Sequence, residues 1–229
     1  MRQGPRLQYF PSARLLGNQL CAEIEAGASA EGRLIALAVG RSTLPHYAGL
    51  DPDAAALEEK VFLPVDELVP APARSRKSFS AQLRAGMPAK LSEVVYEIEV
   101  GDPAQAALGL ERRIEASGLA LCVLGLGPDG HVAFNQPGSG PETRTRVVEI
   151  LPENLCRLGE VAPATHALTL GIASLLAAER IVLVVDGSGK ERALERVIEG
   201  PEGSDLPASW LRRHRDCRVL VVGEAAGRV

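Results

Sequence analysis

The sequence is poor in aromatic residues and contains no long apolar run. Aromatic residues make up only 3% of the 229 residues, although hydrophobic residues make up 46%, so the core must be built mainly from Leu, Val, Ile and Ala. No segment approaches the roughly 18 apolar residues of a membrane span. The N-terminal stretch MRQGPRLQYF also lacks the apolar segment of a signal peptide. These absences predict a cytoplasmic protein that does not insert into a membrane.

A basic surface and a cysteine framework are missing as well. The formal net charge is −4 and the basic residues are scattered along the chain, which argues against a nucleic-acid partner. The 4 cysteines show no CxxC spacing, so we expect reduced thiols and neither disulfides nor a zinc site. No pair of His, Cys or carboxylate residues has the spacing of metal ligands, and we therefore predict no bound metal. A homo-oligomer is compatible with the composition, but no pattern in the sequence indicates one.

Short runs rich in Val, Leu and Ile recur along the chain and predict buried strands. Runs that are apolar at every position are typical of strands covered on both faces, as in a parallel sheet. The predicted strands are Leu34–Val39, Val61–Val65, Leu119–Leu124, Ala167–Leu170, Ile181–Val185 and Val219–Val222. Helical spacing of apolar residues predicts helices at Ala13–Ala26, Pro103–Ser117 and Gly189–Ile198. Together they predict one α/β domain over residues 1–229, a doubly wound, mostly parallel, Rossmann-like sheet with helices on both faces.

Two segments that follow predicted strands have the composition of anion-binding turns. Ligands of open α/β sheets bind at the carboxyl ends of the strands, so these segments matter most. Gly40, Arg41, Ser42 and Thr43 combine a glycine, which permits close backbone approach, with hydroxyl groups and a cation suited to phosphate. A plain turn capped by Ser or Thr is an equally good interpretation. Lys190 stands at the start of a predicted helix, where it is either a phosphate ligand or an ordinary surface lysine. The GxxxxGK[ST] spacing is absent, so ATP is not implied.

Two other segments carry acid–base groups. Asp66 and Glu67 close the run VFLPV, and because neighbouring strand residues point to opposite sides, one carboxylate should face a ligand. That carboxylate would suit proton abstraction, whereas a helix cap or a loop hydrogen bond is the alternative. Asp129 precedes His131 by two residues and could orient its imidazole for general acid–base catalysis. The glycines around this pair complete a GxGxxG pattern, but the sequence FNQP follows instead of a helix, which disfavours a dinucleotide site.

In their order along the chain, these segments resemble the glucosamine-6-phosphate deaminase/isomerase family, which shares its fold with the 6-phosphogluconolactonases. The stretch GLGPDGHVAFNQPGS, from Gly125 to Ser139, is similar to the family's signature loop and carries most of the likeness. Within it, AFNQP is closer to the deaminase pattern DGHIAFNEP than to the lactonase pattern GxDGHTASLFP. The similarity continues at Thr143–Arg146, Ala167–Ile172, Gly187–Lys190 and Pro207–His214.

The resemblance implies a role for each matched residue. Asp66 would move a proton between C2 and C1 of an open-chain sugar phosphate, and His131, oriented by Asp129, would open the pyranose ring. Lys190 and the Gly40–Thr43 loop would bind the 6-phosphate, so that the other end of the sugar meets the acid–base groups. The resemblance thus implies a small-molecule sugar-phosphate substrate and no metal or organic cofactor.

The sequence departs from the family pattern at three places in this site. Gln136, a catalytic candidate by its place in the signature loop, stands where the deaminases have a glutamate, which removes a charge. The phosphate loop reads Gly-Arg-Ser-Thr where the family has Gly-Ser-Thr-Pro. The segment Pro152–Pro163 is shorter than the family's lid, and Arg157 is the candidate for its phosphate-binding arginine. These departures predict an altered specificity.

Three functions therefore stay open. The first is conversion of glucosamine 6-phosphate to fructose 6-phosphate and ammonia, which the signature loop favours. The second is hydrolysis of a sugar-phosphate lactone, with His131 activating water. The third is a non-catalytic sugar-phosphate-binding domain, which the missing glutamate favours; the lack of a helix-turn-helix extension counts against a regulator.

Overall fold

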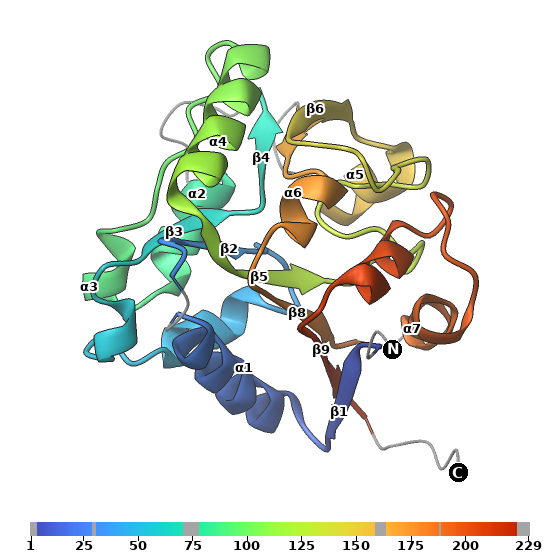
Figure 1. The fold of residues 1–229 in the computed structure, drawn as a ribbon, viewed down its shortest axis with the longest axis horizontal. Helices are drawn as coiled ribbons and strands as arrows, with labels where there is room; N and C mark the ends of the chain where they lie inside the picture. The colour runs from blue at the N-terminus through green and yellow to red at the C-terminus, as the bar shows by residue number, and fades with distance from the viewer. Residues whose placement is uncertain (1–3, 29–30, 71–77, 159–163, 188, 224–229) are drawn as a thin grey trace.

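Six parallel strands form the main sheet, with helices packed on both of its faces (Figure 1). A computed structural model describes residues 4–28, 31–70, 78–158, 164–187 and 189–223, with side chains 156–158 outside the description. From one edge to the other, the strands are β1 (Arg6–Phe10), β9 (Cys217–Val222), β8 (Arg180–Val185), β5 (Leu119–Gly125), β2 (Leu34–Leu37) and β3 (Val61–Pro64). All neighbouring pairs run parallel, which confirms the predicted sheet.

Alternating residues of each central strand supply two separate hydrophobic cores. Leu34 and Ala36 of β2 belong to the core under the helices α4 (Pro103–Ser117), α6 (Ile172–Leu176) and α7 (Glu191–Glu199). Ile35 and Leu37 belong to the core under the helices α1 (Ala13–Gly27), α2 (Phe79–Gly86) and α3 (Ala89–Ser92). Successive side chains of a strand point to opposite faces, so a strand between two helical layers must be apolar at every position. This requirement explains the uninterrupted apolar runs of the sequence.

Short helices of the 3-10 type complete the layers. They are η1 (Leu44–Gly49) and η2 (Ala55–Leu57) near α1, and η3 (Pro207–Arg213), which packs against α6 and α7. Pro at the first position starts η3, because its fixed φ suits a helical turn and its missing N–H has no helical partner to lose.

A second, smaller sheet has antiparallel strands and stands beside the carboxyl end of β3. Its order is β4 (Asp66–Val69), β7 (His166–Thr169) and β6 (Arg146–Glu149), and α5 (Pro152–Leu158) follows β6. The prediction that Ala167–Leu170 joins the parallel sheet was therefore wrong. This run is the middle strand of the small sheet, where Ala167 and Leu168 are both buried in different cores. An apolar run records burial on both faces, which a central antiparallel strand can also have.

The two predicted carboxylates lie in a different strand from the one expected. Asp66 and Glu67 do not end a strand of the main sheet, because β3 ends at Pro64 and the two residues begin β4. Among the predicted helices, Pro103–Ser117 is observed with the same limits, capped by the Asp102 side chain on the backbone N–H groups of Ala104 and Gln105. Neither β1 nor β6 was predicted.

The switch point of the main sheet lies between β2 and β5. From β2 the chain moves outward to β3, whereas from β5 it moves in the other direction through β8 to β9. The connections that leave β2 and β5 at their carboxyl ends therefore diverge, and such a divergence creates the crevice in which open α/β sheets bind ligands. The Gly40–Thr43 turn and the His131 loop are these two connections.

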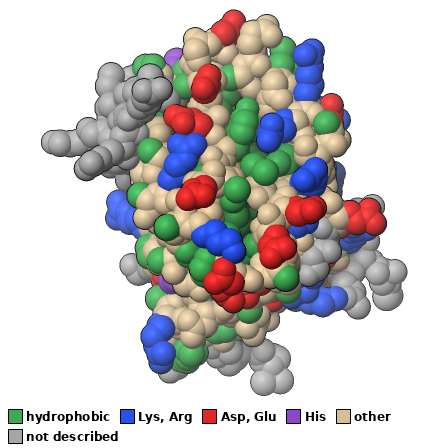
Figure 2. All heavy atoms as spheres, turned by 90° about the vertical axis from the view of Figure 1, so that its left-hand side faces the viewer, with side chains coloured by type: hydrophobic (Ala, Val, Ile, Leu, Met, Phe, Trp, Pro, Cys, Tyr) green, Lys and Arg blue, Asp and Glu red, His purple; other side chains and the backbone are tan. Residues whose placement is uncertain are grey.

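The surface carries no single dominant sign of charge on the face drawn in Figure 2. Acidic and basic side chains are interspersed there, with hydrophobic side chains between them. No helix within the described ranges is long and apolar enough to cross a membrane.

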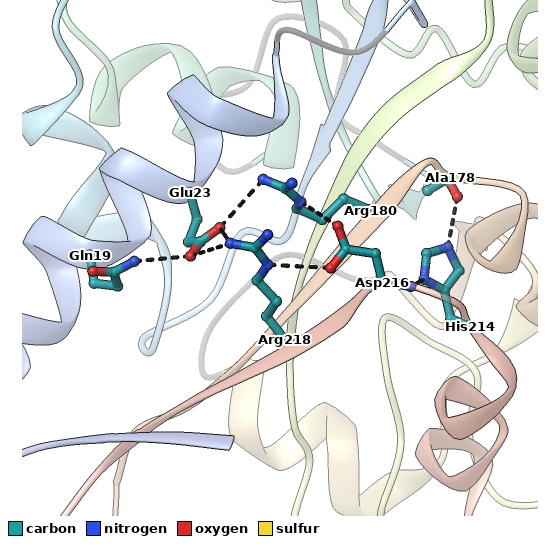
Figure 3. Close-up of polar contacts among 7 residues, drawn as sticks. All are labelled: Gln19, Glu23, Ala178, Arg180, His214, Asp216 and Arg218. Atoms are coloured by element: carbon teal, nitrogen blue, oxygen red, sulfur yellow. Dashed lines mark hydrogen bonds and ion pairs between the residues drawn. The ribbon is translucent and has the colours of Figure 1, made fainter. Parts of the chain in front are cut away.

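A charge network ties α1 to the amino ends of β8 and β9, at the opposite end of the strands from the switch-point connections (Figure 3). Glu23 of α1 is 4% exposed and accepts two hydrogen bonds from Nη1 of Arg218, at 2.8 and 2.6 Å. Arg180 lies 3.5 Å from Glu23 and donates from Nε to Asp216 at 2.8 Å. Asp216 also accepts from Arg218. Each charge thus has two partners of opposite sign, which offsets the cost of burying Glu23.

Glu23→Gln should lower the free energy of unfolding by roughly 3 kcal/mol, because it leaves two partly buried guanidinium groups with a single carboxylate. Urea denaturation at pH 7 measures this loss. Glu115→Gln is the matched control: its side chain is 58% exposed and pairs with Arg144, so we expect less than about 1 kcal/mol. Equal losses in the two variants would contradict the importance of burial for the Glu23 network.

Candidate active site

The loop after β5 brings an imidazole and a carboxylate together at the switch point. The backbone N–H of Gly127 donates to the carbonyl of His131 at 2.9 Å and closes the loop. A Cβ atom at Gly127 would lie 2.3 Å from the His131 ring, so only glycine leaves room for the imidazole. Gly130 has φ +83°, a left-handed conformation that glycine adopts without strain. Gly127 therefore makes room for the imidazole of His131, and Gly130 allows the turn that precedes it.

Asp129 orients His131. Its Oδ1 atom lies 2.5 Å from Nδ1 of the imidazole and also accepts from the His131 backbone N–H at 3.4 Å. Burial raises the pKa of Asp129, but the hydrogen bond and charge of His131 outweigh burial and lower it to about 2. This contact fixes the orientation of the imidazole through Nδ1, which is the arrangement by which a carboxylate supports a histidine in acid–base catalysis. The predicted pairing of these two residues agrees with the geometry.

Asp66 and Glu67 have different environments, although they are neighbours on β4. Glu67 is fully buried and accepts four hydrogen bonds: from the backbone N–H groups of Leu68, Phe79 and Ser80 at 2.8 to 2.9 Å, and from the Ser80 hydroxyl at 2.8 Å. It anchors the start of α2 to β4. Asp66 makes no hydrogen bond through its side chain within the described ranges. Burial, and then the charge of Glu67, raises the pKa of Asp66 to about 8.

Hydrogen bonds dock the end of the His131 loop against the strand that pairs with Asp66. Asp66 lies opposite Thr169 in the β4–β7 ladder. The Thr169 hydroxyl accepts from the backbone N–H of Phe134 at 3.1 Å, and the Asn135 amide donates to the Leu170 carbonyl at 2.7 Å. The small sheet thus joins β4, which carries Asp66, through β7 to the loop of Asp129 and His131, so the predicted acid–base residues come from two separate elements.

The predicted phosphate ligands also meet. Lys190, at the N-terminus of α7, donates to the Ser42 hydroxyl at 2.7 Å, and Ser42 donates to the carbonyl of Asp186 at 3.0 Å. Thr43 is buried and donates to the Ala38 carbonyl at 2.7 Å, so it stabilises the turn. A cation, a hydroxyl and a helix N-terminus at one place are suited to an anion.

The remaining members of this turn have other positions. Gly40 is exposed, and its carbonyl accepts the N–H groups of Thr43 and Leu44 at 3.1 and 2.9 Å. Arg41 is exposed as well, at the entrance to the turn. The predicted Gly40–Thr43 site therefore consists of a solvent-facing half, Gly40 and Arg41, and a buried half, Ser42 and Thr43.

Comparison with known proteins agrees with this geometry. A family model described as glucosamine-6-phosphate isomerases/6-phosphogluconolactonase matches residues 12–220. A glucosamine-6-phosphate deaminase of Streptococcus gordonii is 30% identical over 219 residues, which cover 91% of this chain and 93% of that protein. The chain belongs to this family.

Two further proteins are similar to this member of the glucosamine-6-phosphate isomerase/6-phosphogluconolactonase family, one in sequence and one in structure. A glucosamine-6-phosphate deaminase of Rhodopirellula baltica is 40% identical over 117 residues, which are 49% of this chain and 46% of that protein. The chain thus matches about half the length of this relative. The solved structure of a monomeric glucosamine-6-phosphate deaminase superimposes with a TM-score of 0.84 at 24% identity, covering 96% of this chain and 98% of the other. That likeness confirms the α/β fold.

Gln136 lies in this family member's loop, at the place where the deaminase pattern has a glutamate, but both polar atoms of its side chain bond to residues after the start of β6. It is 7% exposed, and its amide bonds to the segment that joins β6 to α5. Of the described residues, Asp129 is the hydrogen-bonding partner of the imidazole. The side chain of Arg157, the candidate lid arginine, lies outside the described residues.

Several residues that support the loop were not singled out from the sequence. Trp210 of η3 donates from its indole N–H to the Ser139 carbonyl at 3.1 Å, and Ala208 donates to the Gly130 carbonyl at 2.9 Å. Arg146 donates to Asn135 at 2.9 Å and to Ser139 at 3.0 Å. Trp210 and Arg146 fall in motifs that carried the family resemblance, and the conspicuous signal was the single Trp of the sequence.

The other histidines take structural positions. The imidazole of His214 lies 2.7 Å from the Ala178 carbonyl in the interior (Figure 3). His46 packs its ring against Gly17 of α1, where a Cβ atom would lie 2.5 Å from Nδ1. His166 begins β7, as predicted.

Asp66→Asn should stabilise the protein at neutral and alkaline pH. Because the pKa of Asp66 is about 8 in the folded chain against an ordinary value of 3.8, the folded state binds one more proton between these values. The contribution of Asp66 to the free energy of unfolding is therefore fully present below about pH 4 and is lost as the pH rises towards 8. We expect the variant to gain at least about 1.4 kcal/mol at pH 8, the equivalent of one pKa unit, and nothing at pH 4. Urea denaturation over this range measures both, and a gain independent of pH would contradict the raised pKa.

Proposed function

We propose that this chain is a glucosamine-6-phosphate deaminase, which converts glucosamine 6-phosphate and water to fructose 6-phosphate and ammonia. The observation that carries the proposal is the pair of independent acid–base groups at one edge of the sheet, Asp66 and the Asp129–His131 dyad. Ring opening and proton transfer between carbons each need such a group, at different places on the substrate. The names of the relatives, which are glucosamine-6-phosphate deaminases, support the same reaction.

The 6-phosphate binds beside the hydrogen-bonded Lys190 ammonium and Ser42 hydroxyl, where the α7 N-terminus adds to the attraction for an anion. Binding the phosphate at this end fixes the sugar in one orientation and brings C1 and C2 to the acid–base groups. Pre-orientation of this kind can lower a barrier by several kcal/mol.

His131 opens the ring. Its Nε2 atom gives and takes the proton exchanged between the O1 hydroxyl and the ring oxygen O5, while Asp129 stabilises the imidazolium that forms in between. The product is an open-chain aldehyde whose C2 proton is acidified by the neighbouring carbonyl group.

Asp66 then removes the C2 proton and returns it to C1. The enolamine formed first becomes an imine at C2 when C1 is protonated, and water adds to this imine and expels ammonia, leaving the ketone of fructose 6-phosphate. A carboxyl group with a pKa of about 8 is a stronger base than an ordinary carboxylate and can both accept and donate a proton near neutral pH.

Purified protein should release ammonia from glucosamine 6-phosphate, with kcat/KM rising as pH increases towards about 8, because Asp66 acts in its ionised form. Asp66→Asn should lower kcat by about 10²- to 10⁴-fold at pH 8, and the difference should shrink at lower pH, where Asp66 of the unaltered protein is protonated. A coupled assay for ammonia and fructose 6-phosphate measures both. Ammonia release that fails while a 6-phosphogluconolactone is hydrolysed, with His131→Ala abolishing hydrolysis, would reject deamination in favour of the lactonase reaction.

Lys190→Ala should raise KM for glucosamine 6-phosphate by about ten-fold or more and change kcat less, because a charge-assisted hydrogen bond to the phosphate is worth roughly 1.5–3 kcal/mol. Steady-state kinetics of the variant test this split. Lys90→Ala is the matched control, since Lys90 pairs with Asp53 at the surface with a 59% exposed side chain. An unchanged KM in Lys190→Ala would remove Lys190 from the phosphate site.

A further inference from the structure

Gln136 occupies a site with two ends of opposite polarity. Its Nε2 atom donates to the backbone carbonyl of Glu149 at 2.7 Å. Its Oε1 atom accepts from the backbone N–H of Leu151 at 2.7 Å and from Nδ2 of Asn154 at 3.1 Å. Glu149 ends β6 and Asn154 lies in the first turn of α5. One side chain from the His131 loop thus spans the whole β6–α5 connection.

The backbone fixes the orientation of this amide. A carbonyl can only accept a hydrogen bond and a backbone N–H can only donate one, so Nε2 must face Glu149 and Oε1 must face Leu151. A carboxylate of the same shape would place a negative oxygen 2.7 Å from the Glu149 carbonyl, with no proton between them. A neutral group that is a donor at one end and an acceptor at the other is what this site requires.

The Gln136 amide attaches the His131 loop to α5, whereas the hydrogen bonds of the neighbouring loop residues attach it at β7. Phe134 and Asn135 dock the loop on β7, next to Asp66. Gln136, the following residue, docks it on α5 instead, and the backbone N–H of Ser139 returns to the Gln136 carbonyl at 3.1 Å. The contacts with β7 and with α5 together fix the last residues of the loop, which follow Asp129 and His131.

We propose that Gln136 is a positioning residue that exchanges no proton in the reaction, and that its neutral amide places the His131 loop by joining it to α5. The inference rests on the proposed function for its kinetic consequence, because it assigns the acid–base chemistry to Asp66, Asp129 and His131 alone. It also explains how a chain of this family functions without a carboxylate at position 136.

Gln136→Glu and Gln136→Met test the proposal together. Thermal unfolding and, at 25 °C with folded protein, kcat/KM for glucosamine 6-phosphate are measured from pH 8 to pH 5 as ratios to the unaltered protein at each pH. The ratio removes the titration of Asp66 from the comparison. Glu153→Gln serves as a control, since it changes an exposed side chain of α5 and leaves the Gln136 contacts in place.

At pH 8 we expect Gln136→Glu to lower both the Tm and kcat/KM, the latter by about ten-fold, because a buried acceptor then faces a carbonyl. Lowering the pH to 5 should reduce the losses in both Tm and kcat/KM, since the protonated carboxyl of the Gln136→Glu variant can again donate to the backbone carbonyl of Glu149. Gln136→Met, which has nearly the same length and no donor, should show losses that do not change with pH.

Two results would overturn the proposal. A lower Tm with unchanged kcat/KM in both variants would mean that Gln136 is structural without positioning the loop. A kcat/KM for Gln136→Glu at or above that of the unaltered protein at pH 8 would mean that this position serves as an acid–base group. The unfolding measurements need no substrate, so they judge the amide's fit even if glucosamine 6-phosphate is not turned over.

Discussion

The site depends on one buried side chain, the amide of Asn135. It is fully buried, and its Nδ2 donates to the carbonyls of Val132 and Leu170 while its Oδ1 accepts from Arg146. The amide therefore links the loop after β5 to the end of β7 and to the start of β6. Because an unpaired amide in the interior costs free energy, these bonds stabilise the docking of the loop on the small sheet, whose strand β4 carries Asp66.

The two carboxylates of β4 are buried in different environments. Glu67 accepts four hydrogen bonds, whereas Asp66 is buried without such donors in the described part of the chain, and burial raises its pKa to about 8. The charge of Glu67 adds to that rise. A strand places successive side chains on opposite faces, so Glu67 anchors the start of α2 while its neighbour Asp66 keeps the raised pKa that suits the proposed base.

The charge network and the candidate site lie at opposite ends of the parallel strands. The network of Glu23, Arg180, Asp216 and Arg218 pairs its charges at the amino ends of β8 and β9. Asp66 and the Asp129–His131 pair, which are the proposed acid–base groups, follow the carboxyl ends of β3 and β5. Proteins often depart from optimal pairing at functional sites, and the buried Asp66 carboxyl is such a departure.

The sequence by itself determined the parallel α/β sheet, the helix Pro103–Ser117, the glycine loop and the pairing of Asp129 with His131, because these follow from local periodicity, capping and spacing. Only the tertiary structure decided that Ala167–Leu170 belongs to a second sheet and that Ser42 meets Lys190 across the switch point. It also decided that the Gln136 amide bonds to the connection between β6 and α5. Each of these depends on contacts between residues far apart in the chain. The type of a residue, apolar or polar, does not reveal which distant residue it contacts in the folded protein.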